Sequence, residues 1–157
     1  MAELSQRLLD DLKSAVRTSN VTHRDVIRYL RSAIHNQEIE RGRALTDNEI
    51  IDVIQRQIKQ RRESIEHFQK AGRQDLVDVE AGQIEVLQAY LPPQLSYEEV
   101  VSLAREMALE VGASGPRDMS KLMPRLQERI GTQAEGRIMA QAAREVLQSL
   151  SADERSS

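Results

Sequence analysis

The sequence has no cysteine and no tryptophan, and aromatic residues make up only 3% of it. Without cysteine, the chain cannot form disulfides, thiolate metal sites or a cysteine nucleophile. With so few aromatics, a hydrophobic core must be built from Leu, Ile, Val, Met and Ala. Only seven glycines and four prolines interrupt the 157 residues. This composition is typical of a helical protein rather than a β-protein.

Long hydrophobic runs are also lacking. No stretch approaches the roughly 18 to 20 apolar residues that a membrane-spanning helix needs, and residues 1–10 are amphipathic without the apolar run of a signal peptide. We therefore expect no membrane partner. Because a chain without cysteine fits a reducing compartment, the predicted location is the cytoplasm.

The chain carries no excess of positive charge, because its formal net charge is −3. Residues 1–90 carry fourteen Lys/Arg and fifteen Asp/Glu, and residues 91–157 carry eight and ten. Total charge therefore does not favour binding to a polyanion, and any nucleic-acid surface must be a local patch.

Apolar residues recur at helical spacing in seven segments. In the first segment this stripe consists of Leu4, Leu8, Leu9, Leu12 and Val16. Capping residues and glycines separate the segments, because side-chain oxygens satisfy the first helical N–H groups and glycine tolerates the left-handed conformation that ends a helix. The pattern predicts helices over about 3–18, 22–41, 46–71, 74–90, 96–111, 116–130 and 137–150.

Three of these starts have recognisable caps. Thr46 with Glu49, and Ser96 with the acidic residue three positions on, form capping boxes. Thr22 is the predicted N-cap of the second helix. Pro116 suits the first turn of the sixth helix, where its missing N–H is not needed. Pro124 lies inside the sixth helix and is expected to kink or shorten it.

Pro92 and Pro93 mark the predicted domain boundary, because two consecutive prolines cannot continue a helix and hold the chain extended. The predicted fold is all-α. A four-helix N-terminal subdomain (1–91) is joined by this Pro-Pro linker to a three-helix tail subdomain (92–150), and residues 151–157 form a polar tail that we expect to be disordered.

The sequence offers no constellation of nucleophile, base and orienting group, so we predict no catalytic residue. No two of His23, His35 and His67 are four residues apart, and no metal-binding His motif exists. We interpret all three as surface histidines, and we predict no metal and no cofactor.

One basic segment carries donors suited to phosphates in and after the third helix. Its candidate nucleic-acid-binding residues are Lys59, Arg62, Lys70 and Arg73. The alternative is a solvated helix face with Arg62/Glu66 and Lys59/Glu63 ion pairs. Arg61 lies at a seam position, where the alternative role is to pair with a carboxylate of a neighbouring helix.

A second basic segment lies in the tail subdomain, where Arg117, Lys121, Arg125 and Arg129 are spaced four apart and follow one helix face. A glycine-bounded loop comes next, and glycines let a backbone approach a ligand closely. The candidate nucleic-acid-binding residues here are Lys121, Arg125, Arg129, Gly131, Gly136 and Arg137. No aromatic is interleaved for base stacking, so we expect contacts to the phosphate backbone rather than sequence-specific readout.

Two longer motifs occur together: Lys70-Ala71-Gly72-Arg73-x-Asp75-Leu76 and Tyr90-Leu91-Pro92-x-Gln94-Leu95. With Asp118-Met119-x-Lys121 and the Gly131…Gly136 loop, the chain resembles the YqeY family over roughly residues 3–150. This family is similar to the C-terminal region of the GatB subunit of tRNA-dependent amidotransferase. The tail departs from the family pattern at Ser120, where family members usually have Gly, and in a loop without lysine.

The resemblance implies a tRNA-binding accessory module with a role in translation, acting alone or beside an amidotransferase or an aminoacyl-tRNA synthetase. It also implies an alternative that the residues themselves do not supply, a carbon–nitrogen ligase or amidase with glutamine as amido-N-donor. A third hypothesis is a protein-interaction adaptor that binds through the long third helix.

Overall fold

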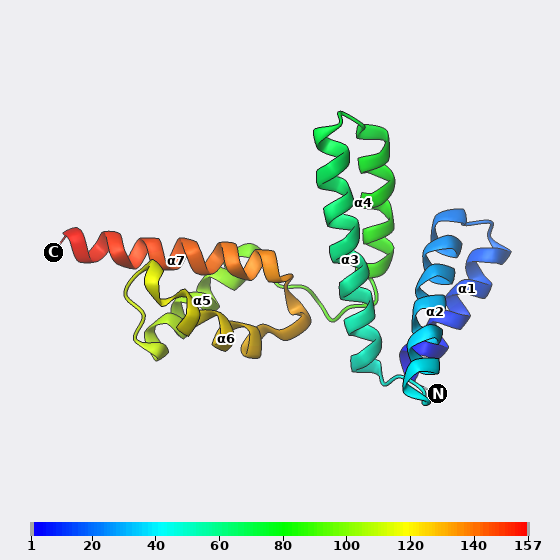
Figure 1. Ribbon diagram of the computed structural model, residues 1–157, viewed down its shortest axis with the longest axis horizontal. Coiled ribbons are helices and arrows are strands. Elements are labelled where there is room, and N and C mark those ends of the chain that lie inside the picture. Colours follow the sequence, from blue (N-terminus) through cyan, green and yellow to red (C-terminus); the bar gives the residue numbers. More distant parts are fainter. Residues whose placement is uncertain (1, 157) are drawn as a thin grey trace. The chain divides into compact units, whose positions relative to one another are not determined.

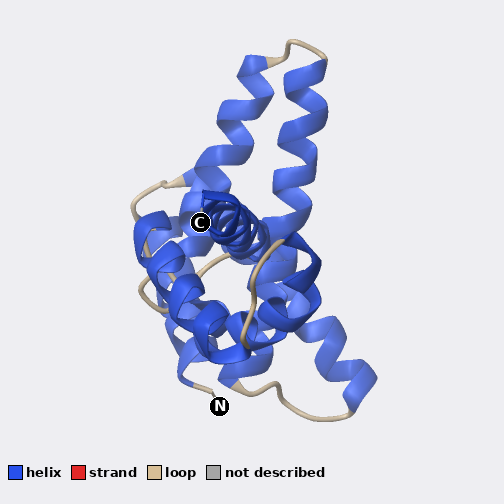
Figure 2. Cartoon of the chain, turned by 90° about the vertical axis from the view of Figure 1, so that its left-hand side faces the viewer, coloured by secondary structure: helices blue, strands red, loops and turns tan. Residues whose placement is uncertain are grey.

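A computed structural model describes residues 2–156, and within them the chain is helical with no strand (Figures 1 and 2). The all-α prediction is therefore confirmed. The helices are α1 (Glu3–Arg17), α2 (Val21–Arg41), α3 (Asp47–Lys70), α4 (Gln74–Gln88), α5 (Tyr97–Val111), α6 (Met119–Ile130) and α7 (Gly136–Ser156). Two short 3-10 helices, η1 (Pro116–Asp118) and η2 (Gly131–Gln133), flank α6. No helix in this described part is both long and apolar enough to cross a membrane.

The first compact unit, unit 1, is Met1–Leu91 and contains α1 to α4. Each of its helices contributes a fully buried leucine or isoleucine to one core, namely Leu8, Leu30, Ile54 and Leu87. α3 and α4 form a long antiparallel hairpin, and α1 and α2 form a second one (Figure 1). Burial of large aliphatic side chains, each contributing roughly 1.5 to 3 kcal/mol, holds the two hairpins together.

The second compact unit, unit 2, is Pro92–Ser157 and contains α5 to α7. Its core combines large side chains of α6 and α7, such as Leu122, Leu126 and Leu147, with fully buried alanines of α5 and α7. Ala104 and Ala142 are two of these alanines. Small side chains let helix axes approach closely, so α6 and its polar outer face rest on a tightly packed α5–α7 pair.

Both predicted capping boxes are present. Thr46 and Ser96 accept from the N–H groups of Glu49 and Glu99, whose carboxylates accept in return from the cap N–H groups. The predicted cap of α2 is wrong, because Asn20 rather than Thr22 accepts from the His23 N–H, at 3.2 Å. α1 ends in a Schellman turn, with Ser19 at φ 57° and the Asn20 N–H donating to the Ala15 carbonyl at 2.8 Å. This turn places Asn20 at the cap position, and α2 begins at Val21, one residue before Thr22.

The sixth helix starts later than predicted, ends at Ile130 as predicted, and is not shortened by its internal proline. Pro116 begins a 3-10 helix, and α6 itself starts at Met119. α6 also continues through Pro124 to Ile130. Pro124 removes only the hydrogen bond to the Ser120 carbonyl, and both residues are exposed, so water can satisfy that carbonyl.

The disordered tail predicted for residues 151–157 differs from the structure, because α7 continues through Ser156. Residues 151–156 contain neither Gly nor Pro, and Ala152 and Glu154 are good helix formers. The core stripe of α7 had ended at Leu150, and the prediction wrongly took the end of the apolar pattern for the end of the helix. Residue 157 lies outside the described residues.

Candidate nucleic-acid interface

Four cations follow the outer face of unit 2, and we name them the α6 ridge: Arg117 in η1, and Lys121, Arg125 and Arg129 in α6. All four are exposed, while Leu122, Leu126 and Ile130 on the other face of α6 are buried. Residues four apart in a helix turn by only about 40° relative to each other, so the ridge drifts slowly around α6. The structure therefore brings three predicted site residues, Lys121, Arg125 and Arg129, onto one exposed face.

Charge in unit 2 is segregated by helix. α6 carries three cations and a single acid, Glu128, whereas α5 carries four glutamates and only Arg105. Arg125 and Arg129 form no ion pair with any side chain in the described part of the chain. Although unit 2 as a whole is acidic, α6 therefore presents a local positive surface. The charge balance of the sequence requires such a local patch for any site that binds a polyanion.

Lys121 is the partly neutralised member of the α6 ridge, because its ammonium lies 3.6 Å from the Asp118 carboxylate. The backbone N–H of Ser114 donates to Asp118 at 2.8 Å. This hydrogen bond, with the nearby charge of Lys121, holds the pKa of Asp118 below its usual range. Asp118 is thus ionised at neutral pH, and it ties the Ser114 loop to the start of α6.

The loop after the ridge is fixed by the Pro-x-Gln-Leu motif. The Gln94 side-chain amide donates to the Pro92 and Thr132 carbonyls at 2.7 and 3.0 Å. The Leu95 N–H donates to the Gln133 carbonyl at 2.8 Å. η2 is therefore held in place beside the last cation of the α6 ridge, which gives this part of the motif a structural role.

The two predicted glycines of this loop differ in their roles. Gly131 has φ 57° and ψ −121°, a conformation that strains any residue with a Cβ, although the space around it is open. Gly136 starts α7 without such a constraint, and a Cβ there would also meet open space. Arg137, the remaining predicted residue, is exposed and paired with Glu135 at 3.1 Å. Open space at both glycines leaves the loop backbone accessible to a ligand.

The candidates of unit 1 do not form a comparable surface. Lys59 and Lys70 are exposed on the same face of α3, about 16 Å apart along the axis. Glu63 and Glu66 occupy that face between them by helical spacing, which interrupts the positive charge.

The two predicted arginines of this segment are already engaged. Arg62 is half-buried and already takes part in an interaction. Arg73, at the exposed α3–α4 turn, donates to both carboxylate oxygens of Asp75 at 3.1 and 2.9 Å. That hydrogen bond raises the pKa of Arg73 and lowers the pKa of Asp75. The Lys-Ala-Gly-Arg-x-Asp-Leu motif therefore has a turn-forming role in this structure.

Arg61 pairs with a carboxylate of a neighbouring helix, as its seam position indicated. Its guanidinium lies 3.3 Å from Glu80 of α4, donates to Gln83, and lies 5.9 Å from the centre of the Tyr29 ring of α2. Only 16% of the Arg61 side chain is exposed. Arg61 thus connects three helices and is withdrawn from any phosphate surface.

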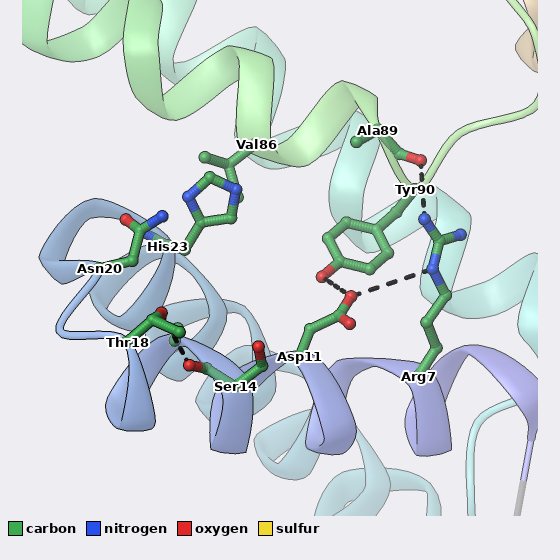
Figure 3. A pocket seen from close by; sticks show the side chains of 10 residues that line it. Arg7, Asp11, Ser14, Thr18, Asn20, His23, Val86, Ala89 and Tyr90 are labelled. Carbon is green, nitrogen blue, oxygen red and sulfur yellow. Dashed lines mark hydrogen bonds and ion pairs between the residues drawn. The ribbon is translucent and has the colours of Figure 1, made fainter.

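A small polar pocket in unit 1, about 260 Å³ in volume, was not predicted from the sequence (Figure 3). The Tyr90 hydroxyl donates to Asp11 at 2.5 Å, and the Arg7 guanidinium lies 4.6 Å above the Tyr90 ring while donating to the Ala89 carbonyl. Burial, reinforced by the Asp11 carboxylate, raises the pKa of Tyr90 well above its usual range. The phenol is therefore a permanent donor rather than a base.

Ser14 and His23 also line this pocket, so that a Ser, a His and an Asp are neighbours there (Figure 3). In the part of the chain that the structure describes, no hydrogen bond links the His23 ring to either Ser14 or Asp11. A nucleophile needs an adjacent, oriented base, and this arrangement does not provide one. His23, His35 and His67 are all exposed, as predicted.

We expect Tyr90→Phe to lower the free energy of unfolding of unit 1 by about 1 kcal/mol, because it removes one hydrogen bond and leaves the packing of the ring intact. Chemical denaturation followed by circular dichroism measures this loss. Tyr29→Phe is the control, since the Tyr29 side chain is 60% exposed and no hydrogen bond to its hydroxyl is present among residues 2–156. Equal stabilities of wild type and Tyr90→Phe would show that the Asp11 contact does not tie α1 to the end of α4.

Comparison with known proteins places these features in context. A family model described as Yqey-like protein matches residues 5–147. The chain is 36% identical over 126 residues to "Altered inheritance of mitochondria protein 41, mitochondrial" of Pyrenophora tritici-repentis, covering 79% of this chain and 69% of that protein. The proteins of the same name from Eremothecium gossypii and Lachancea thermotolerans are 38% identical over 100 residues and 35% identical over 112 residues.

The chain spans between 55% and 69% of the length of these three relatives, and the two latter alignments cover 62% and 69% of this chain. All three relatives are named as mitochondrial proteins. The prediction of a cytoplasmic location is contradicted by these names. It rested only on the lack of cysteine and of an apolar leader, and composition of this kind does not separate one reducing compartment from another.

Proposed function

The chain belongs to the YqeY-like family, and from this premise we propose that it is a tRNA-binding accessory protein that contacts the sugar-phosphate backbone through the α6 ridge. It acts alone or beside a tRNA-handling enzyme, such as an amidotransferase or an aminoacyl-tRNA synthetase. One observation carries the proposal: exposed cations are segregated on α6 in a unit that is otherwise acidic, and two of these cations have no acidic partner among the described residues.

The dimensions of the α6 ridge suit a nucleic-acid backbone. Lys121 and Arg129 are eight residues apart, which places them about 12 Å apart along the helix axis. A duplex presents one negative charge per roughly 1.7 Å of axis, so several phosphates face a ridge of this length. Guanidinium groups of Arg125 and Arg129 can each donate two hydrogen bonds to a phosphate.

The composition of the ridge favours recognition of the backbone over recognition of bases. Base stacking needs exposed aromatic rings, and the one tyrosine of unit 2, Tyr97, donates its hydroxyl to Glu145 on α7 at 2.5 Å. The open backbone at Gly131 adds a place of close approach beside Arg129. Phosphate contacts position an RNA without reading its sequence, so we expect little discrimination among tRNAs of similar shape.

Filter binding of bulk tRNA at several salt concentrations tests the proposal. The double variant Arg125→Gln/Arg129→Gln is expected to bind about tenfold more weakly at low salt and to show a salt slope smaller by about 1.5, because two phosphate contacts no longer release counterions. Arg105→Gln/Arg144→Gln makes the same change in charge at two exposed positions outside the ridge and is expected to retain the wild-type slope.

Two results would overturn the proposal. The first is undetectable or salt-insensitive binding by the wild type, since phosphate contacts must release counterions. The second is an equal loss in both double variants, which would show that binding follows total charge and not the α6 ridge.

A further inference from the structure

A groove of about 740 Å³ lies between α1 and α2 of unit 1, apart from the features described above. Its floor is aliphatic, formed by Leu9 and Leu12 of α1 with the buried Ile34 of α2. α1 and α2 run antiparallel beside each other (Figure 1). The groove therefore runs along a helix hairpin, and Ala44 of the α2–α3 connection lines one end of it.

One rim of this groove carries two arginines and a histidine. Arg28, Arg31 and His35 lie on successive turns of α2 and are exposed. Among residues 2–156 none of the three has an ion pair or a side-chain hydrogen bond. Glu38 is the one acid among the described residues that line the groove, and its carboxylate accepts from the Leu45 N–H at 2.9 Å, toward the α2–α3 connection.

Exposed aliphatic side chains extend the groove at both ends. Val16 follows Leu12 by one turn on α1, and Ile39 follows His35 by one turn on α2. Their exposed fractions are 50% and 65%. From Ser5 to Val16 the surface is about 16 Å long, which is the length of a helix of about three turns.

We propose that this groove binds an acidic amphipathic helix of a partner protein. An aliphatic floor pairs with an apolar stripe, and the guanidinium groups of Arg28 and Arg31 on the rim pair with carboxylates beside that stripe. A nucleic acid would satisfy the rim and leave the aliphatic floor uncovered. A bilayer is flat, and it would contact the edges of a concave channel while the floor stayed in water.

Fluorescence anisotropy with the full chain tests this inference. The probe is a labelled peptide of about 15 residues with Leu at three- and four-residue spacing and Glu on both sides of the stripe. We expect this Glu peptide to bind, and we expect a version with Lys in place of Glu to bind at least about tenfold more weakly. In NMR spectra, the bound Glu peptide is expected to change the chemical shifts of the Leu9 and Leu12 methyl groups.

Charge reversal supplies the matched pair of variants. Arg28→Glu/Arg31→Glu is expected to weaken peptide binding at least tenfold. Arg56→Glu/Lys59→Glu makes the same charge change at exposed α3 positions that do not line the groove and is expected to stay within about twofold of wild type. Circular dichroism establishes that both variants remain helical.

The inference is overturned if the Glu and Lys peptides bind equally, if Arg28→Glu/Arg31→Glu binds like wild type, or if the control variant loses as much. It is also overturned if the chain is a dimer that Arg28→Glu/Arg31→Glu dissociates, since the occupant is then a second copy.

Capture by anionic vesicles that compete with the peptide would assign the groove to a membrane surface. Displacement of the peptide by tRNA would assign the groove to RNA. Peptide binding that is unchanged in the presence of tRNA would show that the groove and the α6 ridge act independently.

Discussion

Leu126→Ala is expected to lower the free energy of unfolding of unit 2 by about 3 kcal/mol. Leu126 is fully buried on the inner face of α6, and removing a buried leucine side chain costs its transfer free energy plus the energy of the cavity that remains. Because unit 2 is small, this loss corresponds to a fall in Tm of roughly 12 to 24 °C. Amide hydrogen exchange of α5 to α7 during a thermal series measures the change.

The same variant distinguishes the effect of the charge of the α6 ridge from the effect of the stability of unit 2, because it changes only the stability. At low temperature, where unit 2 remains folded, Leu126→Ala is expected to bind tRNA with the wild-type salt slope, because no cation has changed. Above its own transition it is expected to lose binding while the wild type still binds. Leu109→Ala is the matched control, since the Leu109 side chain is 77% exposed on α5 and its removal should change stability by less than about 0.5 kcal/mol. Weaker binding by Leu126→Ala in its folded state would contradict a ridge that acts only through charge.

Local chemistry decided the features that could be predicted from the sequence. The capping boxes at Thr46 and Ser96 depend on residues three apart, and the left-handed glycines at Gly42 and Gly112 depend on one residue each. Such signals act within a single turn of chain, so they place helix ends without knowledge of the fold. The boundary after Leu91 followed in the same way from two adjacent prolines, and the two compact units divide at that residue.

Features that depend on contacts between distant segments could not be predicted. Asp11 and Tyr90 are 79 residues apart, and the sequence around either residue does not indicate the other as its partner. The pairing of Arg61 was predicted in part: its place in the seam indicated a carboxylate of a neighbouring helix as one alternative, but the choice of Glu80 depends on how α4 packs against α3. Side-chain networks of this kind are properties of the packing rather than of any one helix.

The apolar stripe of α1 shows the same limit. Leu4, Leu8, Leu9, Leu12 and Val16 have the spacing of a core face, yet only Leu8 is fully buried. A periodic stripe predicts which face of a helix is apolar and not how much of that face the chain itself covers. Of the other four residues, Leu9 and Leu12 line the α1–α2 groove, so a part of the stripe that the core leaves partly exposed is available to a partner.

Gln57 is the one buried polar side chain in the described core, and it lies one turn before Arg61 on α3. It is 5% exposed, and neither its amide nitrogen nor its amide oxygen has a hydrogen-bond partner among residues 2–156. Its neighbours in sequence on the inner face of α3 are aliphatic, with Val53, Ile54 and Ile58 also buried. A buried amide without partners costs about 1 to 3 kcal/mol in lost hydration.

Gln57→Met is therefore expected to raise the free energy of unfolding of unit 1 by about 2 kcal/mol, because methionine has a similar length and flexibility and carries no amide. The corresponding rise in Tm is roughly 8 to 16 °C, measured by calorimetry or by hydrogen exchange of the α3 amides. Gln60→Met, at an exposed position of the same helix, is expected to stay within about 0.5 kcal/mol of wild type. A lower stability of Gln57→Met would contradict the assignment, since it would mean that water reaches this amide in solution and hydrogen-bonds to it. The sign of this single change thus decides whether the core around Gln57 is dry or hydrated.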